Sequence, residues 1–410
     1  MKVLDLNRRL FLRTLAATSM LTAVREQCLL GADTEVPKSA ADFVAGKDSS
    51  LLAYNVKTGE IETPLKLLRE HRITPKEILF VRNNQLAVNC LSLESGSIDG
   101  WMIELAGLVN KLSTVDAALL MRLPQVEHEI VLQCSGNGRA MFSRASKCDG
   151  VQWKNGAMAN VRVKGVSLET FLKHHKVIVA PEAKFLTVEG ADVPTTSGAP
   201  DFEHSVPLSV ALEKAMLVTE MNGERLPRLH GGPVRFVVPG YYGTMNVKWV
   251  TRMRFEAQES TNHHQVGRYR TPLEPIAPGS KFTTTLENSE PNWNMKIKSV
   301  IFWPLEGEQL PTGMNSIRGV AWNDGTAKIV AVEVSTDVGR SWQLAEIEPG
   351  AGRYAWHHWS IKTSLDKGEQ TIWARAIDAQ GRTQPLDGTI AWNPAGYAWN
   401  GVAEVRVNVG

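Results

Sequence analysis

The sequence predicts an α+β fold, in which a mixed α/β domain over residues 61–290 is followed by an all-β sandwich over 291–410. Three observations lead to this prediction. The chain has 410 residues, enough for two domains. Strand and helix patterns mix before residue 290. After about residue 295 the pattern changes to short segments that alternate apolar and polar residues with a period of two.

Strands and helices of the first domain follow from local patterns. "STVDAALLMRLP" predicts a helix with Ser113 as its N-cap and a stop at Pro124. "SLETFLKHH" predicts a short amphipathic helix capped by Ser167. A strand that runs into a loop is expected in "PKEILFVRNN" (75–84). Further strands are expected in the apolar run "EIVLQC" (129–134) and in the glycine-bracketed "GGPVRFVVPG" (231–240).

The second domain reads as an antiparallel sandwich. In "KIVAVEVS" (328–335) every second residue is a valine, which places Val330, Val332 and Val334 on one face. "TIWARAID" (371–378) and "AEVRVNV" (403–409) alternate in the same way. We expect the Trp-rich segments 353–359 and 391–400 to pack in a core or an interface rather than to bind ligands.

The N-terminus differs from the rest of the chain. "NRRLFLRTLAATSMLTAV" carries the pair Arg8 and Arg9 before a short apolar stretch, which resembles a twin-arginine export signal over residues 1–32. An amphipathic first helix is the alternative. Residues 33–60 are polar and irregular, and we expect an arm on the surface. Export by the twin-arginine route predicts a periplasmic protein that folds, often with its cofactor, before transport.

Composition excludes several classes of protein. The formal net charge is only +2, which argues against a nucleic-acid partner, and no apolar run approaches the length of a membrane span. The four cysteines contain no CxxC or CxxCH pattern, so the sequence predicts neither a zinc site nor covalently bound haem. Each cysteine therefore has to be considered separately.

The segment "VLQCSGNGR" (131–139) places Cys134 at the end of a buried strand, before a glycine-rich turn and Arg139. A cysteine there is most often an inert core residue, and half of a disulfide is a second alternative. A turn of this kind also presents a side chain and backbone N–H groups to a cleft. A thiolate in that position needs a cation or a metal beside it, because burial alone raises its pKa.

Several segments together resemble the sulfite oxidase family of molybdenum enzymes. "VLQCSGNGR" resembles its metal-binding cysteine segment, "FVRNN" (80–84) its arginine-bearing loop, and residues 219–250 its long molybdopterin-binding segment. Residues 317–343 and 392–407 resemble the start and end of its immunoglobulin-like dimerisation domain. The resemblance covers about residues 60–410 in the same order.

The resemblance implies a molybdenum–molybdopterin cofactor whose metal is bound by the thiolate of Cys134. It assigns the anion pocket to Arg82 and Arg139, because arginine presents a forked, permanently charged donor to an oxyanion. The cofactor-binding residues that it implies are Asn83, Asn84, Cys134, His230, Arg235, Gly243 and Lys248.

Four positions depart from the family pattern as we align it. Thr219 stands in place of a tyrosine near the metal, and Asn84 in place of a histidine. Val163 replaces a tryptophan, and Ala327 an arginine of the second domain. Each departure removes a large, aromatic or cationic group from the expected substrate wall. We expect Tyr241 or Tyr242 as a substitute phenol.

The expected function is oxidation of sulfite to sulfate by oxygen-atom transfer. With no haem-binding pattern in the sequence, the electrons are expected to pass to an external cytochrome c. The second domain implies a homodimer. Two alternatives remain open: a sulfane dehydrogenase-like enzyme acting on another reduced sulfur substrate, and a secreted binding protein that kept the fold without the chemistry.

Overall fold

The computed structural model describes residues 43–55, 59–194 and 197–410. The predicted export signal lies outside the described residues. Strands dominate the fold, and every α-helix in the described part of the chain has seven residues or fewer. The first domain therefore contains less helix than the mixed α/β architecture that the sequence predicts. Among the described residues, no helix is long and apolar enough to cross a membrane.

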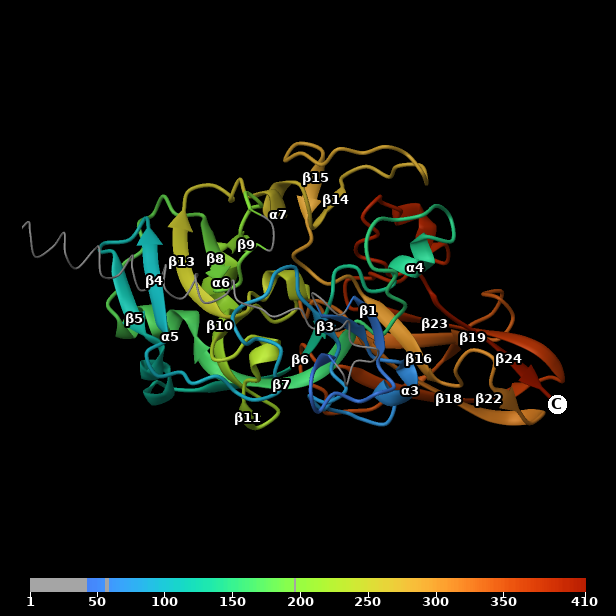
Figure 1. The fold of residues 1–410 in the computed structure, drawn as a ribbon. Coiled ribbons are helices and arrows are strands. Elements are labelled where there is room, and N and C mark those ends of the chain that lie inside the picture. The colour runs from blue at the N-terminus through green and yellow to red at the C-terminus, as the bar shows by residue number, and fades with distance from the viewer. Residues whose placement is uncertain (1–42, 56–58, 195–196) are drawn as a thin grey trace, which may run out of the picture.

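Three sheets form the first domain (Figure 1). The small N-terminal sheet is β1 (Leu52–Asn55), β2 (Glu60–Glu62) and β3 (Val81–Arg82). The second contains β11 (Glu224–Arg225), β10 (Met216–Met221), β7 (Met158–Ser167) and β6 (Val126–Gln133), and β12 (Arg235–Val237) pairs with β10. The third contains β5 (Ser113–Asp116), β4 (Met102–Gly107), β13 (Val250–Glu256), β8 (Phe185–Gly190) and β9 (Glu203–Pro207).

Short helices connect and cover these sheets. They are α3 (Leu65–Leu68), α4 (Arg139–Phe142), α5 (Leu168–His174), α6 (Leu208–Lys214) and α7 (His263–Val266). The 3₁₀ turns are η2 (Ala117–Arg122), η3 (Arg228–His230), η4 (Gly243–Met245) and η5 (Gly388–Ala391). Helix α5 begins as predicted, because the Ser167 hydroxyl accepts a hydrogen bond from the backbone N–H of Thr170.

One local prediction is wrong and a second holds only in part, for identifiable reasons. Residues Ser113–Asp116 form a strand that pairs with β4, and Asp116, not Ser113, caps the 3₁₀ turn that follows. Pairing with a neighbouring strand outweighs the local helix propensity. In the 75–84 segment only Val81–Arg82 is strand. The preceding residues form a turn, in which the backbone N–H of Leu79 donates to the Pro75 carbonyl.

The second domain is a sandwich of two sheets packed around their own hydrophobic core. One sheet is β16 (Lys298–Trp303), β18 (Gly313–Trp322), β22 (His357–Leu365) and β21 (Glu346–Ile347). The other is β17 (Gln309–Leu310), β24 (Ala403–Val409), β23 (Gly368–Asp378), β19 (Ile329–Ser335) and β20 (Gln343–Leu344). All pairs are antiparallel except β17 with β24.

The valine alternation in β19 holds only in part. Val332 and Val334 are buried in the sandwich core, but Val330 is 54% exposed. The register of β19 against β23 shifts between Ile329 and Ala331, and this irregularity turns Val330 to the surface. As expected, Trp356, Trp359 and Trp392 of the Trp-rich segments are buried.

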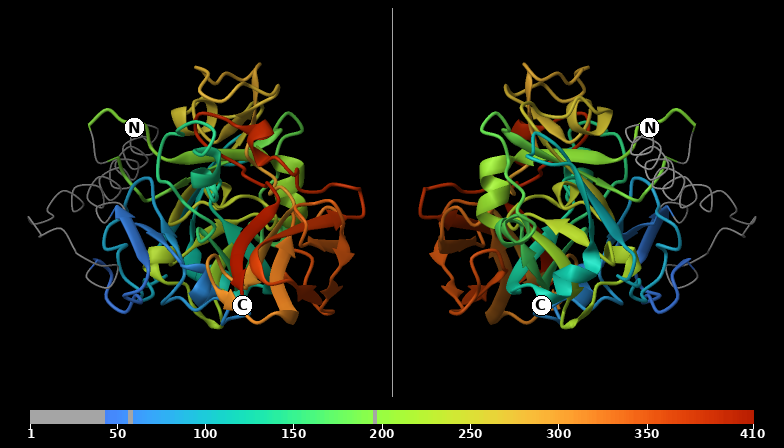
Figure 2. Two further views of the ribbon diagram at one scale, coloured as in Figure 1. Left: turned by 90° about the vertical axis from the view of Figure 1, so that its right-hand side faces the viewer. Right: turned by 90° about the vertical axis from the view of Figure 1, so that its left-hand side faces the viewer.

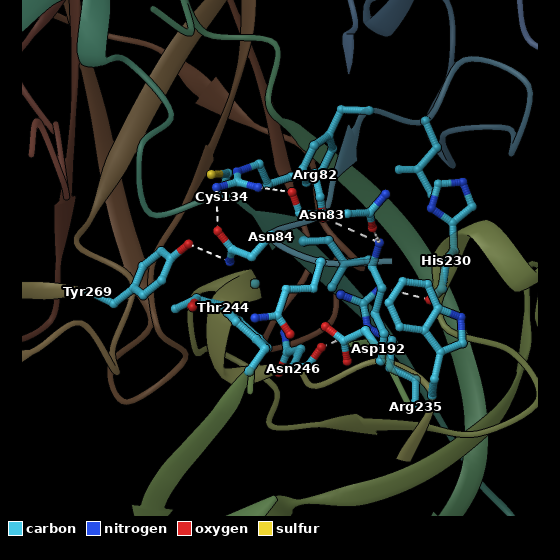
Figure 3. A pocket seen from close by; sticks show the side chains of 18 residues that line it. Arg82, Asn83, Asn84, Cys134, Asp192, His230, Arg235, Thr244, Asn246 and Tyr269 are labelled. Carbon is cyan, nitrogen blue, oxygen red and sulfur yellow. Dashed lines mark hydrogen bonds between the residues drawn. The ribbon is translucent and has the colours of Figure 1, made fainter. Parts of the chain in front are cut away.

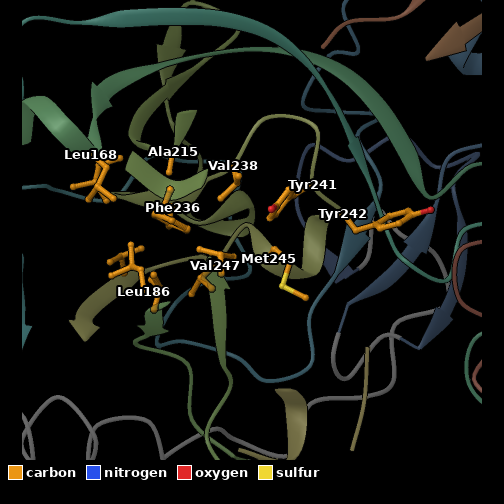
Figure 4. Packing of buried hydrophobic residues seen from close by; sticks show 14 of the residues in the cluster. Leu168, Leu186, Ala215, Phe236, Val238, Tyr241, Tyr242, Met245 and Val247 are labelled. Carbon is orange, nitrogen blue, oxygen red and sulfur yellow. The ribbon is translucent and has the colours of Figure 1, made fainter. Parts of the chain in front are cut away.

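The main core of the first domain fills the space between its sheets (Figure 4). Phe236 of β12 packs there with Leu186 of β8 and Val247. Tyr241 and Tyr242 belong to the same cluster and are almost fully buried. The core reaches the second domain through Trp322, whose indole N–H donates to Gln133 at 2.9 Å. Figure 2 shows the hairpin of β14 (Arg270–Pro272) and β15 (Ser289–Pro291) standing out from this body.

Lys298 on β16 is buried at the junction of the domains, and its ammonium has no hydrogen-bond partner among the described residues. Burial lowers its pKa from the ordinary value of 10.5 to about 7, against the pull of Glu62. Below pH 7 the folded protein holds this charge buried. As the pH rises from 7 to 10.5 the folded state loses the proton first, so stability rises with pH across that window.

Replacing Lys298 by methionine is therefore expected to stabilise the protein by roughly 1–4 kcal/mol below pH 7, with the gain shrinking toward pH 10. Urea unfolding at a series of pH values measures it. Lys47, whose pKa burial also lowers to about 7, keeps part of the pH slope in the variant. Lys296→Met, at an exposed position nearby, is the control and should leave the slope unchanged. Equal stability of wild type and Lys298→Met at pH 6 would contradict the prediction.

Candidate molybdenum-cofactor site

One pocket of the first domain gathers residues from its N-terminal sheet, its second sheet and the loops between the sheets (Figure 3). The space between its lining atoms is about 750 Å³, which includes solvent at its open side. Its wall is formed by Leu79, Phe80, Arg82, Asn83, Asn84, Gln85, Leu132, Cys134, Asp192, Phe202, His230, Arg235, Gly243, Thr244, Asn246, Lys248, Trp249 and Tyr269.

Cys134 follows directly on β6 and is presented to this pocket by a tight turn. Its backbone N–H donates to Ala157 at 2.9 Å, and its carbonyl accepts from Asn137 at 3.0 Å. Gly138 closes the turn with a φ of +92°, a conformation that favours glycine. The thiol is unpaired and 9% exposed, and its sulfur lies beside the guanidinium of Arg82 (Figure 3).

Arg82, Asn84 and Tyr269 form a chain of hydrogen bonds along the pocket wall. An Arg82 N–H donates to Asn84 Oδ1 at 2.6 Å, and Asn84 Nδ2 lies 2.6 Å from the Tyr269 oxygen. Because a guanidinium only donates, the Asn84 atom that faces it must be the oxygen. The amide N–H₂ therefore faces Tyr269 and donates to its oxygen. The phenol proton is left to point elsewhere, which makes Tyr269 a hydrogen-bond donor for a ligand in the pocket.

Basic side chains gather at the opposite end of the pocket (Figure 3). The Lys248 ammonium donates to Asn83 Oδ1 at 2.5 Å and to the Leu229 carbonyl at 2.9 Å. Burial lowers the pKa of Lys248 well below its ordinary value, and that of Arg235 to about 10. His230, also buried, has a pKa well below its ordinary value because of burial and the neighbouring lysines. Because burial disfavours the charged forms of these three bases, an anionic group bound beside them would favour those charged forms and would itself be stabilised.

Hydrogen-bond acceptors complete this end of the wall. Burial raises the pKa of Asp192 to about 7, so its carboxyl changes charge near neutral pH. Gln85 donates its amide N–H to the Pro200 carbonyl at 2.7 Å, and its buried Oε1 has no partner among the described residues. A ligand that carries both N–H donors and a phosphate, as molybdopterin does, matches this set of donors and acceptors. The residues present therefore fit the cofactor.

All of the predicted site residues except Arg139 line this pocket. The guanidinium of Arg139 is buried and donates to the carbonyls of Ala395 at 2.6 Å and Val151 at 2.7 Å. It also lies 5.5 Å from the ring centre of Tyr397. Gly136 and Gly396 leave the space that the side chain fills. Arg139 therefore does not line this pocket beside Arg82, and it joins the Cys134 turn to the second domain.

The departures at Thr219, Val163 and Ala327 lie away from the pocket. Val163 on β7 is buried within a hydrophobic cluster of the first domain. Thr219 on β10 is buried too, and it follows Val218, a member of the same cluster. Ala327 lies in a turn of the sandwich, where its carbonyl accepts from Asn323. Only Asn84 belongs to the pocket wall. Three of the four departures therefore give no support to the expectation that large groups are missing from the substrate wall.

Tyr269 is the functional residue that sequence reasoning missed. Tyr241 and Tyr242 lie in the hydrophobic core and not on the pocket wall (Figure 4), so neither is the expected phenol. The chain has only six tyrosines, and Tyr269 is one of them. No local pattern marks it, because its contact with Asn84 spans 185 residues.

Comparisons with known proteins agree with this geometry. Residues 91–264 match the oxidoreductase molybdopterin binding domain family, and residues 289–409 match the Mo-co oxidoreductase dimerisation domain family. The crystal structure of the sulfane dehydrogenase SoxCD from Paracoccus pantotrophus has a TM-score of 0.71 and 28% identity, covering 85% of this chain and 86% of that one.

Curated relatives include sulfite oxidases and plant nitrate reductases. The mitochondrial sulfite oxidase of Drosophila melanogaster is 32% identical over 365 residues, which cover 85% of this chain and 61% of the relative. This chain thus spans about three fifths of that protein. The sulfite oxidase of Gallus gallus is 32% identical over 356 residues, covering 83% of this chain and 74% of the relative. With both family matches and the cysteine pocket, the chain belongs to the sulfite oxidase family of molybdopterin-binding oxidoreductases.

Proposed function

We propose that the protein oxidises sulfite to sulfate with a bound molybdenum cofactor. The observation that carries the proposal is the placement of Arg82 and the Tyr269 phenol on the same wall as the Cys134 thiol. Sulfite and water give sulfate, two protons and two electrons. The cofactor, when bound, supplies oxygen-atom transfer and takes up the two electrons.

The residues divide into two groups along the pocket. Cys134 gives a soft thiolate ligand to the metal. The anionic end of the pterin would be held by Lys248, Arg235 and His230, with Asn83 and Gly243 on the same wall. Its N–H groups would donate hydrogen bonds to Asp192 and Gln85.

Arg82 and Tyr269 act on the substrate. Arg82 attracts the sulfite anion and holds its oxygens by charge-assisted hydrogen bonds. Tyr269 donates its phenol proton to a substrate or product oxygen, because Asn84 already donates to the phenol oxygen. Donors that are fixed before the substrate arrives lower the energy of the charge that develops in the reaction.

The electrons leave one at a time to an external cytochrome c, and the protein acts in the periplasm after twin-arginine export. The paired arginines Arg8 and Arg9 support the export route. The match to a Mo-co dimerisation domain supports a homodimer.

A second candidate is the oxidation of a sulfane sulfur, and the position of Arg139 favours it. Arg82 is the arginine nearest Cys134 on the pocket wall, while Arg235 lies at the far end (Figure 3). One arginine matches a substrate with a single negative charge, such as a persulfide, better than it matches sulfite. The similarity to a sulfane dehydrogenase supports the same alternative.

Replacing Arg139 by lysine is expected to lower the free energy of unfolding by about 2 kcal/mol, because lysine cannot hold both carbonyls. The KM for sulfite should stay within about twofold, since the side chain does not line the pocket. Urea unfolding and steady-state kinetics measure the two effects. A tenfold higher KM for sulfite at an unchanged free energy of unfolding would show that Arg139 binds the substrate anion after all.

The proposed function is tested by molybdenum analysis together with sulfite-dependent reduction of cytochrome c. About one molybdenum per chain and rapid reduction would support it. Metal with turnover of a persulfide but not of sulfite would select the second candidate. Protein that stays free of molybdenum when made in a host with the full molybdopterin pathway would contradict both.

A further inference from the structure

Residues 393–398 of the second domain reach across to the cysteine turn of the first. The backbone N–H of Ala398 donates to the Ser135 carbonyl at 2.8 Å, directly beside Cys134. The Ala395 carbonyl accepts from Arg139 at 2.6 Å. These contacts fix the segment 393–398 relative to the pocket.

Tyr397 lies at the centre of this segment and stacks on Tyr269. The two ring centres are 5.2 Å apart and the planes differ by 22°. Asn393 holds the backbone of Tyr397 through both of its amide atoms, at 2.9 and 3.0 Å. Tyr397 is only 7% exposed, and the Arg139 guanidinium also lies against its ring. The ring that contacts Tyr269 is therefore itself held firmly.

The hydrogen bond from Asn84 controls the phenol oxygen of Tyr269 but not the plane of its ring. A phenol can rotate about a single hydrogen bond and move its proton away from a substrate. The stack with Tyr397 restricts this rotation, because offset aromatic stacking favours one orientation of the two rings. A displacement of about 1 Å at a reacting centre costs up to about a hundredfold in rate.

We propose that Tyr397 is a positioning residue, contributed by the second domain, that holds the Tyr269 phenol in its donating orientation. The inference rests on the proposed role of Tyr269 in the reaction. It assigns to the second domain a part in catalysis through one side chain, in addition to dimerisation.

The experiment compares Tyr397→Leu, which removes the stack, with Tyr397→Phe, which keeps it. The matched control is Tyr354→Leu, because Tyr354 is also 7% exposed and belongs to the same domain. Crystal structures of the molybdenum-loaded variants give the position of the Tyr269 ring and its distance from Asn84. Kinetics with the substrate that the wild type turns over give kcat and KM.

In Tyr397→Leu we expect a displaced Tyr269 ring and a kcat about tenfold lower, with KM within about twofold because Arg82 still binds the anion. Tyr397→Phe and Tyr354→Leu should keep the ring position and kcat. In a Tyr269→Phe background, Tyr397→Leu should cause no further loss, since both changes remove the same donor.

An unmoved Tyr269 ring in Tyr397→Leu would overturn the inference, and so would losses that multiply in the double variant. An equal kcat loss in Tyr354→Leu would mean that the domain contact as a whole is responsible. The ring position requires no substrate, so a failure of the sulfite proposal leaves this measurement decisive.

Discussion

Replacing Cys134 by serine is expected to reduce sulfite-dependent turnover at least about a thousandfold, the scale seen when an essential catalytic group is removed. Serine is nearly isosteric, but its hydroxyl stays protonated at neutral pH and is a hard oxygen ligand. The metal would lose the only soft ligand that the pocket wall offers in the part of the chain that the structure describes. The fold should survive, because the backbone bonds from Cys134 to Ala157 and Asn137 do not involve the sulfur.

The test combines kinetics with molybdenum and pterin analysis of the purified variant. The pterin should remain bound, since Lys248, Arg235 and His230 are unchanged. Cys148→Ser is the matched control, because Cys148 is also a buried, unpaired cysteine but lies outside the pocket. Turnover of Cys134→Ser near the wild-type rate would contradict the assignment of Cys134 as the metal ligand. Equal losses in the two variants would indicate general damage to the fold.

The sequence predicts those parts of the site in which chemistry and local structure coincide. Cys134 follows an apolar strand and precedes a glycine turn, and both features are local. Arg235 and Lys248 lie within the resembling segment 219–250, and its fold brings them to one pocket. The strands of the sandwich are predicted by their period of two, because one face of each packs in a core.

Residues whose roles depend on contacts between distant segments could not be predicted in this way. Tyr269 meets Asn84 across 185 positions, and Arg139 meets Ala395 across 256. Nothing local distinguishes Tyr269 from Tyr241 or Tyr242 as the pocket phenol. All three pack in one core cluster, and only Tyr269 also lines the pocket.

The placement of Arg139 also explains how the second domain is attached beside the site. An arginine in a glycine-rich turn could face either a ligand or a neighbouring chain segment, and the sequence leaves this open. In the structure its Nε and Nη1 donate to carbonyls of both domains, those of Ala395 and Val151, and the side chain does not line the pocket. Positive charge for the substrate therefore depends mainly on Arg82.

Arg82 is positioned by the small N-terminal sheet, and its charge is balanced by one neighbour. On β3 it is directly opposite Glu60 of β2, and the two side chains form an ion pair at 3.4 Å. The Arg82 side chain is 23% exposed, and so it faces the open part of the pocket while still paired. The pair lowers the net positive charge that a substrate anion meets at this position.

Replacing Arg82 by glutamine is expected to lower kcat/KM for sulfite about a hundredfold, mainly through KM. A hydrogen bond to a charged group contributes about 1.5–3 kcal/mol. The glutamine variant loses the positive charge and also the planar set of N–H donors of the guanidinium. It also leaves Glu60 unpaired, and its carboxylate would repel the anion. Glu60→Gln should have the opposite effect and lower KM by a few-fold, because the full charge of Arg82 then acts on the substrate.

The double variant separates the two contributions. If Glu60 repels substrate in Arg82→Gln, the double variant should recover part of the lost affinity, with an unchanged molybdenum content. Arg252→Gln is the control, since Arg252 pairs with Glu104 on the surface of the third sheet and lies outside the pocket. A KM for Arg82→Gln equal to that of the wild type would show that Arg82 does not bind the anion. Substrate recognition would then depend on Tyr269 and the cofactor alone, as a substrate that carries little charge would require.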